Sequence, residues 1–92
     1  MATISIWRGF HSFTGDRNYE VVTFVGSEIG SVRFNINGDD IQYRVFRDEN
    51  DNVIVFFVER RGYECVAEIF EYPTLEEAAK EYRFILKKAG VI

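Results

Sequence analysis

The six residues Val53-Ile54-Val55-Phe56-Phe57-Val58 decide how this 92-residue chain must fold. All six are β-branched or aromatic, and a run of this length and composition favours a β-strand over a helix. Turn-forming residues bound the run, Asp48-Glu49-Asn50-Asp51-Asn52 before it and Arg61-Gly62 after it. A strand that is apolar on both faces must be covered on both faces. The sequence therefore predicts a central strand that lies between two covering layers.

A hairpin precedes this strand. Ser31 to Asn37 and Ile41 to Arg47 each alternate apolar and polar residues, and Asn37-Gly38-Asp39-Asp40 between them tolerates the positive φ of a hairpin turn. A four-residue turn would pair Ile36 with Ile41, Phe34 with Tyr43, and Val32 with Val45. A two-residue turn keeps the same side chains on the same faces.

We expect further strands around this hairpin, at Thr3–Arg8, Tyr19–Val25, Asn52–Arg60 and Tyr63–Glu71. Gly9–Asn18 is interpreted as a polar connection, and Gly26–Gly30 as a turn that ends the second strand. No short connection fixes the place of Thr3–Arg8 in the sheet.

The chain ends in a predicted helix. Thr74-Leu75-Glu76-Glu77 forms a capping box after Pro73, and Gly90 is a typical C′ residue. An apolar stripe at helical spacing connects these ends: Leu75, Ala78, Ala79, Tyr82, Ile85, Leu86 and Ala89. The predicted fold is α+β, a single domain over residues 1–92. Its antiparallel, mostly meandering sheet has five or six strands, with the C-terminal helix on one face.

Composition limits the function classes. The net charge of −4 argues against a partner dominated by phosphate groups. The single cysteine, Cys65, cannot form a disulfide within the chain, and we expect a packed core thiol and a cytoplasmic location. We expect no membrane association, because the start of the chain lacks a signal-peptide pattern and no apolar run could cross a bilayer.

The second face of the sheet has no obvious cover in the sequence. Gly9–Asn18 could fold back over it with Phe10 and Phe13, the sheet could curl onto itself, or two copies could pack face to face. A bare face of this size would exceed the apolar patches usual for monomers. A protein partner or a homodimer is therefore one expected cover.

No catalytic, metal or cofactor site is expected. The only histidine, His11, lies near Ser12 and Asp16, but neighbours in sequence do not make a catalytic triad. Asp48–Asn52 begins like a calcium loop with Glu59 in the last position, but Val53 stands where the loop requires glycine. We interpret it as a hairpin turn. One cysteine and one histidine cannot build a structural zinc site.

Two groups of residues are candidates for binding. The first combines aromatic and arginine side chains, which dominate binding hot spots: Trp7, Arg8, Phe10, His11, Phe13 and Arg17. Its aromatic residues could instead plug the second sheet face. The second group is Arg44 and Phe46, which with Arg33 could share the outer face of the hairpin and stack single-stranded bases.

These features favour a small, non-enzymatic protein-interaction or regulatory module. It would act through an aromatic and apolar sheet face, alone or as a dimer. One alternative is a module that binds single-stranded nucleic acid through outer aromatic and arginine residues. A second alternative is a small-ligand binder or an enzyme with a pocket between the helix and the sheet.

Overall fold

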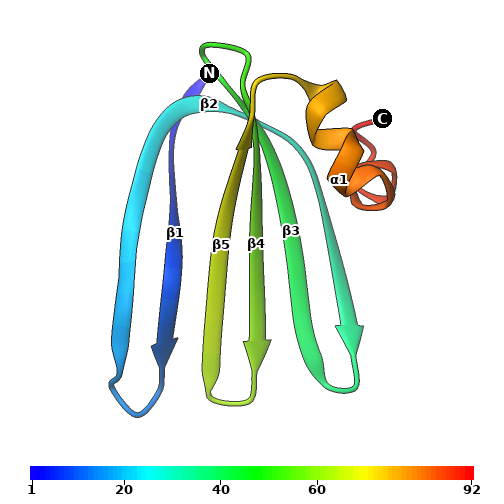
Figure 1. Cartoon of the computed structure of the whole chain (residues 1–92). Coiled ribbons are helices and arrows are strands. Elements are labelled where there is room, and N and C mark those ends of the chain that lie inside the picture. The colour runs from blue at the N-terminus through cyan, green and yellow to red at the C-terminus, as the bar shows by residue number, and fades with distance from the viewer.

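The apolar run lies in a strand that has a partner strand on each side. The computed structural model describes residues 1–92 and shows an antiparallel sheet of five strands followed by one helix (Figure 1). The elements are β1 (Ala2–Ser12), β2 (Arg17–Ile36), β3 (Asp39–Asp48), β4 (Val53–Arg61), β5 (Glu64–Tyr72) and α1 (Leu75–Lys88). The predicted α+β fold is confirmed, with β4 between β3 and β5.

The helix begins and ends as predicted. Oγ1 of Thr74 accepts a hydrogen bond of 3.1 Å from the backbone N–H of Glu77, so the N-terminal cap is formed. Gly90 follows the helix with a φ of 79°. Inside α1, Tyr82 departs from helical geometry, with φ −122° and ψ 29°, and marks a kink. The helix is neither long nor apolar enough to cross a membrane.

The β2–β3 hairpin has the shorter of the two turns considered. Ile36 pairs with Asp39, Phe34 with Ile41 and Val32 with Tyr43, which leaves Asn37-Gly38 as the turn. Asn37 and Gly38 have φ values of 54° and 87°, as such a turn requires. The pairing differs from that of a four-residue turn, but the faces on which the side chains lie are the predicted ones.

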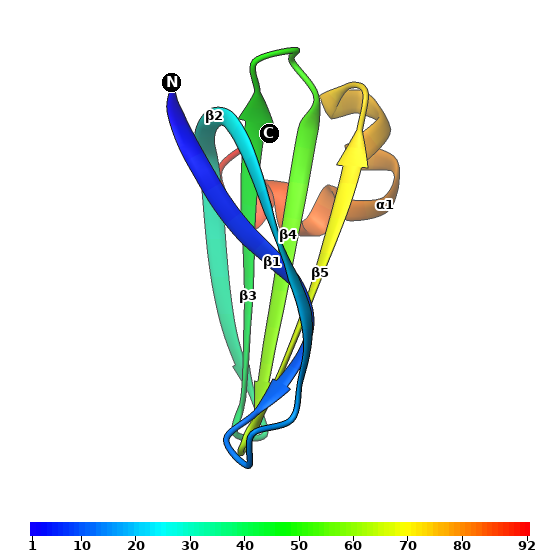
Figure 2. The same ribbon diagram turned by 90° about the vertical axis from the view of Figure 1, so that its left-hand side faces the viewer.

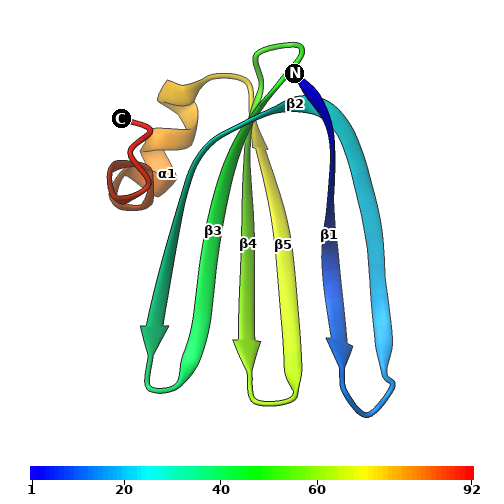
Figure 3. The same ribbon diagram turned by 180° about the vertical axis from the view of Figure 1, so that it is seen from behind.

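β2 does not end at Gly26. It is one strand of 20 residues, and the prediction of a turn at Gly26–Gly30 is wrong. Its first half pairs with β1 and its second half with β3, with an irregularity between Glu28 and Gly30. A Cβ atom on Gly26 would lie 2.4 Å from the carbonyl oxygen of Arg47, so glycine permits a close approach there. The strand thereby arches over the end of β3 (Figures 1 and 3).

β1 also extends further than predicted. Gly9 to Ser12 belong to the strand and are not a loop, because they pair with Glu64 to Ala67 of β5. This short pairing closes the sheet in the order β1-β2-β3-β4-β5. Above it, β1 and β5 diverge, as the side view shows (Figure 2).

The curl of the sheet supplies the second cover of β4. We define the inner core as the buried residues on this face, which come from β1, β3, β4 and β5: Ile6, Phe46, Ile54, Phe56 and Ala67. Half-buried residues of β1 and β2 pack against it, namely Ile4, Val22 and Phe24. Of the three covers considered, the curled sheet is the one observed. Gly9–Asn18 does not fold back as a plug, and Phe13 at its tip is 71% exposed.

The helix covers the other face of β4. Val45 and Val53 pack there against Ala78 and Leu86, and all four are fully buried. Tyr72 of β5 and Ile29 of β2 flank this cluster, so the helix crosses every strand from β5 to β2. It therefore lies over the upper part of the sheet (Figure 1).

Candidate functional site

The helix-side face of the sheet is only partly covered. Below the helix, half-buried apolar side chains of β1 to β5 lie in adjacent register positions. We call this surface the open half-face and define it as Phe10, Phe34, Ile41, Tyr43, Phe57 and Val66. No helix or loop lies over this part of the sheet (Figures 1 and 3).

Aromatic rings connect the open half-face to the helix. The rings of Tyr43 and Phe57 have centroids 5.1 Å apart, and Tyr43 lies 6.2 Å from the ring of Tyr82. At one side, Phe34 stacks on Phe84 of the helix at 6.3 Å, and Phe84 is 62% exposed. The apolar surface therefore continues from the sheet onto the exposed side of the helix.

Carboxylates give the open half-face a negative character. Glu59 lies next to Ile41 across the strands and is ion-paired with Arg61 at 2.9 Å, whereas Glu68 lies next to Phe57 and makes no ion pair. Burial raises the pKa of the Tyr43 hydroxyl, and the nearby charges of Glu59 and Glu68 raise it further. A cationic group would find favourable electrostatics on this surface.

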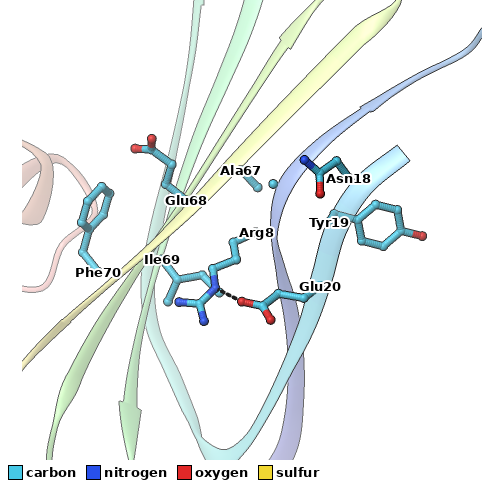
Figure 4. Close-up of a pocket in the computed structure, with 9 residues that line it drawn as sticks. Arg8, Asn18, Tyr19, Glu20, Ala67, Glu68, Ile69 and Phe70 are labelled. Atoms are coloured by element: carbon cyan, nitrogen blue, oxygen red, sulfur yellow. Dashed lines mark hydrogen bonds and ion pairs between the residues drawn. The ribbon is translucent and has the colours of Figure 1, made fainter. Parts of the chain in front are cut away.

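A groove adjoins this face along the edge of β5. It has a volume of about 610 Å³ and lies between the β1–β2 hairpin and β5 (Figure 4). Arg8 and Glu20 form an ion pair on one wall, and Glu68 and Phe70 lie on the other. Ala67 and Ile69, which belong to the inner core or pack on it, line the groove as well.

The structure brings together Trp7 and His11 of the predicted binding residues. Their rings lie 5.1 Å apart, and the ring of Tyr19 lies 5.7 Å from Trp7 and 5.9 Å from His11. Tyr19 pairs with Gly9, which lies between them in β1. A Cβ atom on Gly9 would lie 2.2 Å from the Asn18 carbonyl oxygen, so this packing requires glycine.

The remaining residues of this group are dispersed. Phe13 lies at the tip of the β1–β2 hairpin, 6.2 Å from the ring of Tyr63. Arg17 is exposed and pairs with His11 in register, and Phe10 lies on the open half-face beside Val66. Arg8 lines the groove. The segment therefore does not form one continuous binding surface.

The second predicted group is not a surface cluster. Phe46 is fully buried in the inner core, so the prediction that it lies on an outer face is wrong. The reason is that β2 arches over this face of β3, and the ring of Phe24 packs edge-on against Phe46 at 5.6 Å. Arg44 is ion-paired with Glu28 at 2.8 Å and lies 5.0 Å above the Phe46 ring. Phe46 cannot stack on a nucleic-acid base.

The Asp48–Asn52 segment forms a hairpin turn, as interpreted. Oδ1 of Asp48 accepts hydrogen bonds of 2.9 Å from the backbone N–H groups of Asn50 and Asn52. Burial alone would raise the pKa of Asp48, but hydrogen bonds from the Asn52 side chain and from both backbone N–H groups outweigh it and lower the pKa. The Asp48 carboxylate therefore stabilises the hairpin turn.

Groups for metal binding or nucleophilic chemistry do not assemble. No set of three or more His, Cys, Asp and Glu side chains is arranged to hold a metal ion. The hydroxyl of Ser12 is hydrogen-bonded to that of Thr14 at 2.7 Å. Cys65 is a buried free thiol, which confirms its prediction as a core residue.

An apolar sheet face was predicted to bind a partner, but among the residues of the open half-face only Phe10 was a predicted binding residue. The alternation of the β2–β3 hairpin does put Phe34, Ile41 and Tyr43 on one face, so part of the signal was present. The groove had no local signal, because it depends on the pairing of β1 with β5, more than fifty residues apart in the sequence. Comparisons with protein-family models, curated proteins and solved structures gave no match for the chain.

Proposed function

We propose that this protein is a small, non-enzymatic interaction module that binds a protein partner through the open half-face. The observation that carries the proposal is the set of aligned apolar and aromatic side chains that the helix leaves uncovered. Contiguous apolar surface that the fold leaves partly accessible to solvent is typical of interaction sites. Aromatic residues such as Tyr43 and Phe57 are also enriched among binding hot spots.

The charges on this face favour a partner of different sequence over a second copy. Glu59 and Glu68 lie within the open half-face, and Asp39 and Glu64 lie near Arg61 at its lower rim. Two copies packed face to face would place like charges opposite one another, which costs several kcal/mol. A partner with apolar residues and Lys or Arg side chains would complement both features.

The proposed setting is the cytoplasm, where a regulatory or adaptor protein would encounter its partner. The only cysteine is a buried thiol, so the fold does not depend on an oxidised disulfide. Stability comes instead from the inner core and from the helix packed on the sheet.

Affinity capture with matched variants tests the proposal. Tyr43→Ser and Phe57→Ser change the open half-face, and Phe13→Ser changes an aromatic residue at the hairpin tip, outside the open half-face. We expect one protein species to bind wild type and Phe13→Ser and to be lost from both face variants. Circular dichroism and thermal unfolding of each variant show that the loss reflects the surface and not the fold. Equal retention by all four proteins, or by none, contradicts the proposal.

Sedimentation over a range of concentrations separates a partner of different sequence from a second copy. We expect a monomer of 10.8 kDa at all concentrations. If a dimer forms and Tyr43→Ser dissociates it, the open half-face is the binding surface, but its partner is a second copy of this chain. A dimer unaffected by Tyr43→Ser would place self-association elsewhere.

A further inference from the structure

Two strand edges face each other without being paired. β1 and β5 share a ladder only where Gly9–Ser12 meets Glu64–Ala67. Beyond it, β5 pairs with β4 alone from Glu68 to Tyr72, and β1 pairs with β2 alone from Ala2 to Arg8. Each edge therefore presents backbone N–H and C=O groups that have no partner strand, and such edges are templates for a further strand.

The groove lies in the space between these edges. β1 and β5 separate above their short ladder (Figure 2), and the groove of about 610 Å³ is lined from both strands (Figure 4). Ala67 and Ile69 give it an apolar lining that continues into the inner core. Alternate residues of β5 point to the other face, where Glu68 and Phe70 lie.

We propose that this groove binds an extended peptide segment of a partner protein, which pairs with the Glu68–Tyr72 edge of β5 as an additional strand. Backbone hydrogen bonds to β5 hold the segment, and alternate side chains enter the apolar part of the groove. The site differs from the open half-face because it uses a strand edge and not a sheet face, although Glu68 borders both.

The carboxylates of the groove indicate which charge the bound peptide segment should carry. Glu20 is neutralised by Arg8 across the β1–β2 ladder, whereas Glu68 has no ion-pair partner. The segment that fits therefore alternates small or medium apolar residues with Lys or Arg, so that a cation lies next to Glu68.

Backbone NMR with a synthetic peptide tests this proposal. The probe is the capped peptide Lys-Val-Lys-Val-Lys-Val-Lys, and its controls replace the central Val with Pro or every Lys with Glu. We expect the Lys-Val peptide to shift the amide signals of residues 2–8 and 68–72. It should also slow hydrogen exchange at those amides of 68–72 that do not donate to β4. The proline peptide should bind about tenfold more weakly, because it lacks a backbone donor. The Glu-Val peptide should be weakened by like charge.

A matched pair of protein variants tests the role of charge. Glu68→Gln should weaken the Lys-Val peptide about threefold, as expected for an exposed ion pair. Glu76→Gln, an exposed change of the same kind on the helix, should leave the affinity unchanged. Equal effects of the two variants would contradict the assignment of Glu68.

Three outcomes would overturn the strand-addition site. The first is the absence of any shift at millimolar peptide. The second is a set of shifts confined to Tyr43, Phe57 and their neighbours, which would place the peptide on the open half-face. The third is slow, concentration-dependent exchange at residues 68–72 in the free protein, because the edge would then already be paired with a second copy.

Discussion

The two faces of β4 are covered in different ways and to different extents. Phe56 points to the inner core and is 4% exposed, whereas the next residue, Phe57, points to the open half-face and is only half-buried. The inner face is covered by β1 and β2, which are parts of the same sheet. The outer face is covered by one helix that does not reach Phe57.

The helix leaves this gap because of its direction. It runs across the strands from Tyr72 of β5 to Gly30 of β2, so its width and not its length determines how much of each strand it covers. A helix with its side chains is about 10–12 Å wide, whereas a strand of nine residues such as β4 extends roughly 30 Å. A single crossing helix therefore leaves the lower part of the face uncovered.

The largest expected effect comes from comparing the neighbouring residues Phe56 and Phe57, which lie on opposite faces of β4. Phe56→Ala removes a ring from the closed inner core and should lower the free energy of unfolding by about 3–5 kcal/mol. Phe57→Ala removes the same atoms from the open half-face and should cost only about 1–2 kcal/mol, because its ring is partly hydrated already. Urea denaturation of the two variants measures both values.

The contrast between these variants matters more than either value. Equal losses would mean that Phe57 is as enclosed as Phe56, and the open half-face would then not exist in solution. A larger loss for Phe57 would mean that a cover over the outer face is present in the isolated protein. Both results would contradict the proposed binding surface.

Local patterns predicted the helix, the β2–β3 hairpin and the meander from β3 to β5. The capping box at Thr74 and the turn at Asn37-Gly38 each depend on neighbouring residues, and both form as expected. The cover of the inner face could not be predicted in the same way. It depends on the pairing of Gly9–Ser12 with β5, which no local pattern specifies.

Gly26 shows why the path of β2 was missed. Glycine in a sequence usually indicates a turn, but Gly26 pairs with both Ala2 and Asp48 within continuous strand structure. It is required there because another backbone approaches closely, and a close approach leaves no signature among its sequence neighbours. Phe46 was expected to be exposed for the same reason, because the bend at Gly26 is what brings the preceding part of β2, with Phe24, over its face of β3.

The next prediction compares two glycines of β2. Gly26 permits the arch of β2 over the inner face, and Gly30 permits the end of the helix to pack on the outer face. A methyl group on Gly26 would meet the Arg47 carbonyl oxygen, and Arg47 is held in ladders with both β2 and β4. Gly26→Ala should therefore lower stability by about 1–3 kcal/mol. A methyl group on Gly30 would lie 2.6 Å from the Ala89 carbonyl oxygen and from Cγ2 of Val91, where the residues after the helix pack on β2.

Gly30→Ala should cost less, about 1 kcal/mol, because a helix end can move away while a paired strand cannot. Thermal unfolding measures both costs, and Ser27→Ala serves as an exposed control in the same strand. Trp7, the only tryptophan, packs against the inner core, so its fluorescence should change for Gly26→Ala and not for Gly30→Ala. A reversed order would mean that the helix is held more tightly than the curl of the sheet.

The smallest effect concerns the turn beneath the arch of β2. Asp48 pairs with Gly26, and the backbone N–H of Glu49 donates a hydrogen bond of 3.0 Å to the Val25 carbonyl. The pKa of Asp48 is lowered in the folded protein, so its carboxylate stabilises the fold above the ordinary pKa of an aspartate. This contribution is lost as the pH falls through the lowered pKa.

Asp48→Asn should therefore reduce stability at neutral pH by about 1 kcal/mol and flatten its dependence on pH in the acid range. Glu49→Gln, in the same turn, removes an equal charge without touching these hydrogen bonds, and it should keep the wild-type pH profile. Trp7 fluorescence during urea unfolding between neutral pH and strong acid records all three profiles. Parallel profiles for wild type and Asp48→Asn would show that this turn does not support the inner cover, and the arch of β2 would then depend on Gly26 and the core alone.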